Sequence, residues 1–348
     1  MSRLVMPKPA FFMHMPDSFF YYHAILEQLP PESFDVIIPD DAPPALIELL
    51  ENSDYTARYI SELVNARTMY RYLISDHIFL DDYHLLSDLA TRQIRFFCEL
   101  GYDHLMLSND NRFYDMFLCM GKYQRRHLNF CAPENFHVVG WPQYDRWYAG
   151  MDVELELLQD TFNCDRYRPV LVWQPTFGDL SSIEAYAKII EKLSTRYNIV
   201  IKPHDYTLYE EPERRALLQG LKGIQAVITD PFDAVYLMVL ADYVLADYGN
   251  TPFGAVYTDQ RLLLLNIPEA HSHAFTGLGS SDITLRNYYP SVDPDTNVEA
   301  IVRLIEQEDP WSQNGMRLQR LRERLFVNLT GRAALESARL ISQLPQHL

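Results

Sequence analysis

The stretch that most constrains the fold of this chain lies between residues 231 and 267. Apolar residues at helical spacing in 234–241 are followed by a short apolar run at 243–246 and by a second run at 262–267. This order predicts a helix, a strand, a loop, a short helix and a strand. Such an alternation is typical of α/β proteins with parallel sheets.

The loop between the first strand and the short helix of this stretch has the sequence Tyr-Gly-Asn-Thr at 248–251. Pro252 suits the first helical position, so Asn250 or Thr251 is the expected N-cap. A glycine-containing turn that opens a helix directs backbone N–H groups at one spot, and α/β proteins hold phosphate in this way. An ordinary capped turn explains the same residues, so the loop alone leaves both interpretations open.

The same alternation of strands and helices recurs along the rest of the chain. Apolar runs of strand length occur at residues 10–13, 35–40, 70–74, 94–97, 116–120, 137–139, 170–173, 198–201 and 225–228. Helical patterns occur at residues 18–29, 45–51, 58–66, 122–130, 183–193, 214–221 and 316–344, the last with a break at Gly331. Ser181 and Glu184 have the spacing of a capping box before the helix at 183–193. The pattern predicts an α/β fold with two Rossmann-like, doubly wound domains.

An acidic helical connector near residues 150–168 is the expected boundary between the two domains. We expect an N-terminal domain at 1–150, a second domain at 151–325 and a C-terminal helix at 326–348 that returns to the first domain. The length of 348 residues favours two hydrophobic cores over one. Two such domains predict a ligand in the cleft between them.

The charge and the cysteines exclude several classes of function. A formal net charge of −17 opposes binding to nucleic acid and to a broad anionic membrane surface. The four cysteines lack the paired spacing of a structural zinc site, and free thiols are expected in a reducing cytoplasm. The N-terminus lacks the apolar core of a signal peptide, and no apolar run reaches about twenty residues.

Polar residues follow three of the expected strands in the second half of the chain. They lie at 176–179, 202–204 and 247–251. Ligands of open α/β sheets bind beyond the carboxyl ends of the strands. Lys202 can neutralise phosphate, and His204 can donate to a phosphate oxygen or carry a proton. Solvated strand-end turns would have the same residues, but three such clusters together favour a functional site.

Five segments in order resemble motifs of one known family. They are Val139-Gly140-Trp141-Pro142-Gln143-Tyr144-Asp145-Arg146, Gln174-Pro175-Thr176-Phe177-Gly178, Lys202-Pro203-His204, Ala241-Asp242-Tyr243-Val244-Leu245-Ala246-Asp247-Tyr248-Gly249-Asn250, and Leu329-Thr330-Gly331-Arg332-Ala333-Ala334. They are similar to motifs of the CDP-glycerol glycerophosphotransferase family, the teichoic-acid primases and polymerases, whose catalytic region has the GT-B fold of two Rossmann domains. The resemblance covers about the last 260 residues.

The resemblance implies a transferase in which an acceptor hydroxyl attacks the β-phosphorus of CDP-glycerol or a related CDP-polyol and CMP leaves. It implies catalytic roles for His204 and Lys202, with the first domain on the acceptor side. It assigns the donor nucleotide and its diphosphate to Thr176, Phe177, Gly178, Asp247, Gly249, Asn250 and Thr251. The donor is a substrate, no cofactor or metal is expected, and the acceptor is a glycan or lipid-linked molecule of the cell envelope.

Two departures from the family pattern bear on the reaction. The family has a histidine, proposed as the base, where Cys98 stands here, and a thiol is a poor general base for an alcohol. Glu99 is an alternative base; otherwise the correspondence or the chemistry differs. The family serines that hold the diphosphate are replaced by Gly249 and Asn250, so backbone N–H groups, Asn250 and Thr251 are the expected donors.

Two other functions remain open with the same fold. One is a sugar-nucleotide glycosyltransferase or epimerase, in which a sugar carbon is attacked. The other is a degenerate, non-catalytic binding protein, which Cys98 and the missing serines favour. The expected location is cytoplasmic, with peripheral association at the inner face of the membrane as an alternative.

Several histidines and aspartates outside these motifs are weaker candidates. His14 and Asp17 follow the first strand on the acceptor side, where a helix cap and a partly buried histidine explain them equally well. Residues 76–77 and 81–84 contain aspartates and histidines that suggest a metal, although a solvated loop is the simpler interpretation. His271 and His273 have no third ligand near them in the sequence.

Overall fold

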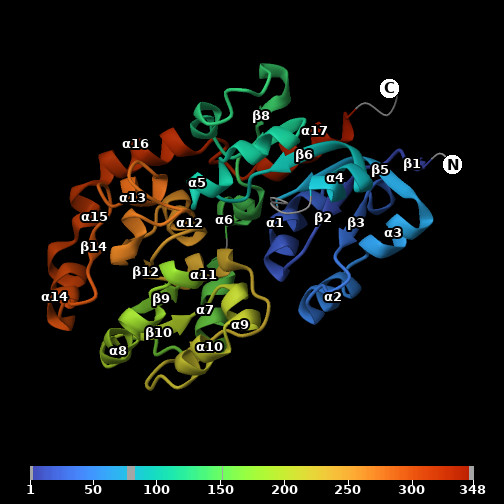
Figure 1. Cartoon of the computed structure of the whole chain (residues 1–348). Helices are drawn as coiled ribbons and strands as arrows, with labels where there is room; N and C mark the ends of the chain where they lie inside the picture. The colour runs from blue at the N-terminus through green and yellow to red at the C-terminus, as the bar shows by residue number, and fades with distance from the viewer. Residues whose placement is uncertain (1–2, 77–82, 151, 345–348) are drawn as a thin grey trace. The chain divides into compact units, whose positions relative to one another are not determined.

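The computed structural model describes residues 3–76, 83–150 and 152–344 (Figure 1). The chain forms two compact units. Unit 1 consists of Met1–Cys98, Leu107–Ala149 and Arg324–Leu348, and unit 2 consists of Glu99–Met106 and Gly150–Glu323. A short segment from the first half of the chain, residues 99–106, therefore belongs to the unit built mainly from the second half.

Unit 1 is built on an eight-stranded parallel sheet. Its strands are β1 (Leu4–Met6), β2 (Ala10–Phe12), β3 (Asp35–Ile38), β4 (Ala57–Tyr59), β5 (Thr68–Ser75), β6 (Ala90–Phe96), β7 (Met116–Cys119) and β8 (Phe136–Val138). Their order is β4-β3-β2-β5-β6-β7-β8, and β1 pairs with the start of β5. The order reverses between β2 and β5, which pair directly with Phe12 opposite Ser75.

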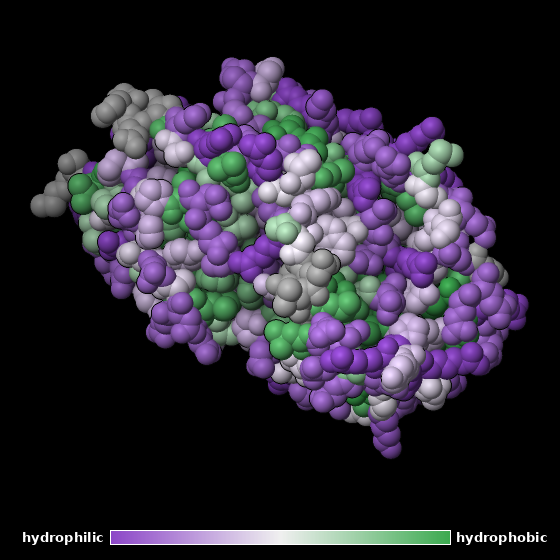
Figure 2. All heavy atoms as spheres, turned by 180° about the vertical axis from the view of Figure 1, so that it is seen from behind, coloured by the Kyte–Doolittle hydropathy of each residue, from purple (hydrophilic) through white to green (hydrophobic). Residues whose placement is uncertain are grey.

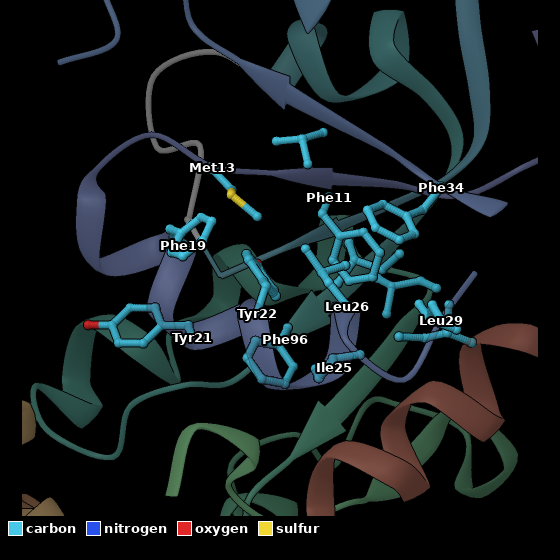
Figure 3. Close-up of a cluster of buried hydrophobic side chains, with 14 of the residues drawn as sticks. Phe11, Met13, Phe19, Tyr21, Tyr22, Ile25, Leu26, Leu29, Phe34 and Phe96 are labelled. Carbon is cyan, nitrogen blue, oxygen red and sulfur yellow. The ribbon is translucent and has the colours of Figure 1, made fainter. Parts of the chain in front are cut away.

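The helices of unit 1 connect these strands and carry the apolar faces that cover them. They are α1 (Pro16–Leu26), α2 (Pro44–Glu51), α3 (Ile60–Ala66), α4 (Tyr83–Leu89), α6 (Asp145–Ala149) and α17 (Ala333–Ser342). Helix α1 brings Tyr22 against Phe11 of β2 and Phe96 of β6, with ring centroids 5.3 and 5.2 Å apart. Figure 3 shows this aromatic cluster, in which α1 and the strands contribute the side chains. Burial of these rings is the main favourable term that holds α1 on the sheet.

Unit 2 is built on a six-stranded parallel sheet. Its strands are β9 (Val170–Gln174), β10 (Asn198–Ile201), β11 (Ala226–Val227), β12 (Tyr243–Ala246), β13 (Leu262–Leu265) and β14 (Ser291–Val292). Their order is β11-β10-β9-β12-β13-β14. Numbered from its own first strand, this is the order 3-2-1-4-5-6 of dinucleotide-binding Rossmann domains. The four central strands are buried along their whole length, which explains their continuous apolar sequences.

The helices of unit 2 precede the first of these strands, lie between them or follow the last of them (Figure 1). They are α5 (Asp103–Met106), α7 (Asp152–Thr161), α8 (Ile183–Leu193), α9 (Asp205–Glu210), α10 (Pro212–Gln219), α11 (Ala234–Leu240), α12 (Asn250–Tyr257), α13 (Ser281–Leu285), α14 (Val298–Arg303) and α15 (Pro310–Gln313), and α16 (Gly315–Leu325) ends at the border with unit 1. Helix α8 buries Ile183, Tyr186, Ala187 and Ile190. The helix predicted at 183–193 is thus confirmed.

Most of the predicted strands are confirmed within two or three residues at each end, whereas four helix predictions need correction. Residues 122–130 form only a 3₁₀ helix at Lys122–Arg126, because the Gln124 side chain accepts from the N–H groups of Met120 and Gly121 and closes a tight turn. The helix expected at 58–66 begins at Ile60, because residues 57–59 pair with β3 as β4.

The third and fourth corrections concern the starts of α8 and α12. The predicted capping box of Ser181 and Glu184 is wrong, because the N-cap of α8 is Ser182, whose own side chain makes no cap hydrogen bond. The predicted N-cap of α12 at Asn250 or Thr251 is also wrong, because the chain enters the helix at Asn250 through Gly249, whose φ is +83°. Pro252 is still tolerated, since the first N–H groups of a helix have no intrahelical partner.

The break at Gly331 is confirmed, because the predicted long C-terminal helix is divided into α16 and α17 there. Gly331 has a φ of +72°, and a Cβ at this position would lie 2.9 Å from the Tyr148 side chain. Helix α17 then packs on unit 1, where Ala338 and Ile341 join the cluster of Figure 3.

The exterior differs sharply in character from these cores. Figure 2 shows hydrophilic residues over most of one face, with hydrophobic residues in separate patches. No helix in residues 3–76, 83–150 and 152–344 is both long and apolar enough to span a bilayer.

Candidate functional site

The reversal of strand order in unit 2 places β9 beside β12, with Gln174 opposite Ala246 at their carboxyl ends. The connections from these two strands leave in opposite directions along the sheet, to β10 and to β13. In open α/β sheets the crevice at such a point is where ligands bind. The residues that follow β9 and β12 therefore define the candidate site, and they include the predicted Thr176 and Asp247.

Asp247 is the centre of this site and has no measurable exposure to solvent. Its carboxylate accepts from the backbone N–H groups of Thr176 at 2.9 Å, Ser182 at 2.7 Å and Tyr248 at 2.8 Å. Burial raises the pKa of this carboxyl, and the hydrogen bonds from Ser182, Thr176 and Tyr248 act in the opposite direction. Asp247 thus fastens the loop after β9 to the end of β12. This geometry makes it a positioning group for its neighbours.

The segment 99–106 forms a third wall of the site. The hydroxyl of Tyr102 hydrogen-bonds to Oγ1 of Thr176, and the Tyr102 backbone N–H donates to Asp282 at 2.8 Å. The other Asp282 oxygen accepts from the N–H of Gly249 at 3.0 Å. A Cβ on Gly101 would overlap the Gly249 carbonyl group, so only glycine allows this close approach.

Asp282 corrects one expectation from the sequence. The N–H of Gly249, expected to bind a donor phosphate, is already bound to this buried carboxylate. Burial raises the pKa of Asp282 to about 7, against the lowering effect of the Gly249 and Tyr102 N–H groups. The carboxyl therefore changes charge close to neutral pH. Asp282 belongs to the short helix α13, far along the chain, and none of the sequence motifs included that region.

Arg286 brings a positive charge to this site that the sequence motifs did not indicate. Its guanidinium donates to the backbone oxygens of Asp247 at 2.9 Å and Asp282 at 2.8 Å. It also lies 3.9 Å from the centre of the Tyr248 ring. Because an arginine stays protonated, a fixed cation lies directly behind the strand-end loop.

His204 and Lys202 follow β10, the neighbour of β9 on the other side. Nδ1 of His204 accepts from the N–H of Tyr206 at 3.0 Å and caps α9, so the ring proton of the neutral form is on Nε2. Burial lowers the pKa of His204 to about 4, with Asp205 acting in the opposite direction and Lys202 reinforcing the shift. His204 is therefore a neutral N–H donor at neutral pH.

Lys202 has a more internal position than the sequence suggested. Its side chain is 6% exposed, and Nζ donates to Asp205 at 2.8 Å and to the Pro203 carbonyl at 3.1 Å. The charge of Lys202 is thus partly balanced by Asp205. The electrostatic attraction between Lys202 and a negatively charged ligand beside His204 is therefore weaker.

An aromatic pocket of about 200 Å³ opens next to Tyr102 and Thr176. It is lined by Tyr102, Phe177, Gly178, Asp179, Leu180, His273 and Phe275. The ring of Tyr102 lies 5.6 Å from Phe275 and 6.2 Å from Phe177, and Phe177 lies 4.6 Å from His204. Flat rings in this arrangement can hold another flat ring by stacking. The sequence motifs placed Phe177 and Gly178 at this site, but not Phe275.

Gln174 and Thr251 contribute side-chain groups at the base of the site. The Thr251 hydroxyl donates to Oε1 of Gln174 at 3.3 Å. Gln174 is 5% exposed, and within the described part of the chain its buried Nε2 has no hydrogen-bond partner. An unsatisfied buried amide donor costs roughly 1–3 kcal/mol, so a ligand acceptor would be stabilising there. Asn250, next to Thr251, is the first residue of α12.

Cys98 and Glu99 lie at the end of β6, where the chain crosses from unit 1 to unit 2. Cys98 is 4% exposed and its Sγ lies 4.0 Å from Oδ2 of Asp76. Glu99 is partly exposed and opens the segment that contains Tyr102. The base role of Glu99 stays a prediction.

The segment after β8 that carries Asp145 has a structural task in unit 1. The Asp145 carboxylate accepts from the N–H groups of Ala333 at 3.0 Å and Ala334 at 2.7 Å, at the start of α17. Trp141 is fully buried, with its ring 5.7 Å from Phe326. The first and the last of the five motifs, at 139–146 and 329–334, are thus joined by hydrogen bonds.

The remaining histidine and aspartate candidates are placed as follows. His273 lines the aromatic pocket and accepts from the N–H of Phe275 at 3.2 Å. His271 ends a 3₁₀ helix. The metal suggestion at 76–77 and 81–84 falls largely on residues 77–82, which lie outside the described residues. Among the described residues, no group of three or more His, Cys, Asp or Glu side chains is arranged to hold a metal ion.

Comparisons with solved structures show proteins that have a similar fold. No protein-family model and no curated protein sequence matches the chain. A variant of the wall teichoic acid polymerase TagF, solved after soaking with CDPG, is similar at a TM-score of 0.69 and 14% identity, over 97% of this chain and 89% of that chain. Anabaena Alr3699/HepE in complex with UDP and glucose is similar at a TM-score of 0.60 and 10% identity, over 97% of this chain and 100% of that chain.

A glycosyltransferase from Rickettsia africae is similar at a TM-score of 0.54 and 10% identity, over 99% of this chain and 100% of that chain. At these identities the likenesses show the fold. The predicted class, α/β with two Rossmann-like units as in GT-B proteins, is confirmed.

Proposed function

We propose that this chain is a transferase that binds a nucleotide-diphosphate-linked donor at the carboxyl ends of β9, β10 and β12. The donor proposed is CDP-glycerol or another CDP-polyol, and the acceptor is a hydroxyl of a cell-envelope glycan, reached from the cytoplasmic side. The observation that carries the proposal is the switch point of the unit 2 sheet, the place between β9 and β12 where the strand order reverses. There, Asp247 and Asp282 fix three loops around an aromatic pocket and around the amide donor of Gln174.

Each group at the site has a role in this proposal. The rings of Phe177 and Phe275 hold the nucleoside, because stacking on aromatic side chains accepts any base. His204 Nε2–H and the Gln174 amide donate to diphosphate oxygens, and the Thr251 hydroxyl orients the Gln174 side chain. Arg286 adds a fixed positive charge behind the loop. Lys202 acts at longer range through its shared charge.

The reaction proposed is displacement at phosphorus. An oxygen of the acceptor hydroxyl attacks the β-phosphorus of the donor and forms a new P–O bond. The bond from that phosphorus to the bridging oxygen breaks, and CMP leaves with the electron pair. The acceptor proton passes to a base. Hydrogen-bond donors that face the developing negative charge lower the barrier, and losing one commonly costs about a hundredfold in rate.

The similarity to TagF soaked with CDPG supports the choice of a CDP-linked donor. A second candidate is a sugar-nucleotide glycosyltransferase, in which a sugar carbon is attacked and a nucleoside diphosphate leaves. The similarity to a protein in complex with UDP and glucose favours it. Stacking does not by itself choose between cytosine and uracil, so both donors fit the aromatic pocket.

Calorimetry with the purified protein tests donor binding. CDP-glycerol, CDP, CMP, UDP-glucose and UDP are titrated separately, and we expect the tightest binding for CDP-glycerol. Chromatography of the products then separates the reactions: CMP from CDP-glycerol supports the first candidate, and UDP from UDP-glucose supports the second. No heat and no turnover with any of these compounds would reject the proposed function.

Matched variants link any binding to this site. His204→Ala should lower turnover about a hundredfold, and the loss of its cap on α9 should lower the melting temperature slightly. Tyr167→Ala is the control in the same unit, because the Tyr167 side chain is 97% exposed. Binding without turnover in the wild type would instead identify a non-catalytic binding protein.

A further inference from the structure

Three buried carboxyl groups of unit 2 form one hydrogen-bonded cluster around the loop that follows β12. Asp247 has no exposure to solvent, and Asp282 and Asp103 are 2% and 3% exposed. Asp282 and Asp103 are joined reciprocally: Asp282 accepts from the N–H of Tyr102, and Asp103 accepts from the N–H of Ser281, both at 2.8 Å. The cluster therefore brings several acidic side chains together in the interior of one unit.

Arg286 brings positive charge to this cluster, but it does not pair with the carboxyl groups. Its guanidinium donates to the backbone oxygens of Asp247 and Asp282 and lies over the Tyr248 ring. The phenols of Tyr102 and Tyr248 face the same carboxyl groups and stay neutral, because burial raises the pKa of both. One guanidinium thus faces three carboxyl groups, and the cluster has an excess of negative charge if all three are ionised.

The hydrogen bonds show which of two carboxyl groups holds a proton more readily. Asp247 accepts from three backbone N–H groups, whereas Asp282 accepts from two, with one on each oxygen. Such donors stabilise the ionised form of a carboxyl group. Burial raises the pKa of Asp282 to about 7, and the nearby Asp103 carboxylate acts in the same direction. Of Asp247 and Asp282, the second therefore takes up a proton more easily near neutral pH.

Asp282 also lies next to the place proposed for the donor diphosphate. Its Oδ1 accepts from the N–H of Gly249 at 3.0 Å, and α12 begins at the next residue. The first turn of α12 contains Thr251, which hydrogen-bonds to Gln174, the amide assigned to the diphosphate. The N-terminus of a helix attracts phosphate. A diphosphate bound there has a buried carboxyl group close to it, and two buried negative charges repel each other strongly.

We propose that unit 2 binds the donor together with one proton, which the Asp282 carboxyl group takes up from the solvent. The proposal rests on the transferase function given above and names the protonation state that its donor site requires. A proton on Oδ1 removes the negative charge beside the diphosphate. It also weakens the hydrogen bond from Gly249, so this N–H becomes available to a phosphate oxygen, while Oδ2 still accepts from Tyr102.

Proton uptake is measured by calorimetry with CDP-glycerol and UDP-glucose at pH 7.5. Each donor is titrated into the protein in buffers that differ in their heat of ionisation, and the slope of the observed heat against that heat gives the protons taken up. These donors are chosen because both of their phosphates are linked on two sides, whereas a terminal phosphate itself titrates at a pKa of about 6. We expect uptake of a large fraction of one proton for each donor bound.

The pH dependence of donor affinity gives a second measurement on the wild type. Because binding takes up a proton, the affinity should fall as the pH rises above 7, by up to about tenfold for each pH unit. Below pH 6 the affinity should level off, because Asp282 is then protonated before the donor binds. This measurement needs no variant, so it tests the proposal even if a substitution in the cluster prevents folding.

Asp282→Asn identifies the group that takes up the proton. An amide stays neutral at every pH and, like a protonated carboxyl group, has one acceptor oxygen and a donor. We expect no proton uptake, an affinity that does not change with pH, and binding about tenfold tighter than in the wild type at pH 8.5. Asp160→Asn is the matched control in the same unit, because its side chain is 67% exposed, and it should take up protons as the wild type does.

Three outcomes would contradict the proposal, and they are distinguishable. Donor binding by the wild type without proton uptake overturns the coupling while the transferase function stands. Proton uptake that persists in Asp282→Asn overturns the role of Asp282. No binding of either donor rejects the proposed function, and the proton coupling with it.

Discussion

The backbone N–H of Thr176 donates to the Asp247 carboxylate at 2.9 Å and so joins the ends of the two strands between which the sheet of unit 2 reverses its order. The same carboxylate holds the N–H groups of Ser182 and Tyr248. One buried side chain therefore sets the shape of both loops that face the candidate donor site. The negative charge of Asp247 is stabilised by these three backbone N–H groups.

Asp247→Asn should destabilise the protein and weaken donor binding together. An amide has one acceptor oxygen and adds a donor where three N–H groups converge. At least one buried N–H then loses its partner, at a cost of about 2 kcal/mol or more. Urea unfolding measures the stability. Asp160→Asn, at a side chain 67% exposed, should stay within about 0.5 kcal/mol of the wild type.

Gly249→Ala should be more costly than the matched substitution Gly178→Ala. Both glycines have positive φ, +83° and +64°. A Cβ on Gly249 would lie 3.3 Å from the Tyr102 ring, whereas one on Gly178 would have no heavy atom within 4 Å. We expect about 2 kcal/mol for Gly249→Ala and about 1 kcal/mol for Gly178→Ala, which carries backbone strain alone. Equal melting temperatures for the two variants would contradict this.

His204 should make the protein less stable as the pH falls from 6.5 towards 4. Its pKa is about 4 in the folded protein, against 6.5 when unfolded, so the unfolded chain binds more protons in this window. Stability therefore rises with pH there, and the contribution is fully present above pH 6.5. His204→Gln should remove this part of the pH dependence of the unfolding free energy. A profile that is unchanged in this variant would contradict the shift.

Asp282 should have the opposite effect on the pH dependence of stability, in a pH range that overlaps that of His204. Its pKa is raised from 3.8 to about 7, so the folded protein binds more protons between these values and stability falls as the pH rises. The Asp282→Asn variant lacks this increase in stability at lower pH. Its free energy of unfolding should therefore decrease more steeply from pH 7 to pH 5 than that of the wild type. Denaturant titrations at a series of pH values compare the two slopes.

Phe275→Ala should weaken nucleotide binding about tenfold without changing the donor preference. Stacking on one aromatic ring contributes roughly 1–3 kcal/mol, and Phe275 lies at the pocket wall with its ring 5.6 Å from Tyr102. Calorimetry with CMP and UMP measures the effect. Tyr167→Ala again serves as the control, and equal affinity in Phe275→Ala would show that the nucleoside binds elsewhere.

Much of the fold could be predicted from the sequence because its strands are buried on both faces. Val170–Gln174 and Leu262–Leu265 are continuous apolar runs, and the helix of 183–193 shows its stripe plainly. Two short strands of unit 1 could not be predicted in this way. The residues of Leu4–Met6 and Ala57–Tyr59 are exposed or half-buried, so their sequences lack the apolar pattern that full burial imposes.

The candidate site was predicted only where it follows directly from strand ends. Thr176, His204 and Asp247 lie after β9, β10 and β12, as the apolar runs indicate. Tyr102, Asp282 and Arg286 come from segments distant in the chain, and no local pattern connects them to those strands. The protonation state and the hydrogen-bond partners of each group could not be predicted from the sequence either. His204 is neutral because of burial, and the Gly249 N–H is taken by Asp282.

The sequence by itself determined the alternation of strands and helices, the parallel α/β class, and which polar residues follow the strands, because these depend on residues close together in the chain. Only the tertiary structure decided the strand order, and with it the two switch points that bring Thr176 to Asp247 and Ser18 to Asp76. The physical reason is that the groups buried beside these carboxylates come from distant segments. Packing therefore fixes their protonation and their hydrogen-bond partners, which local sequence does not encode.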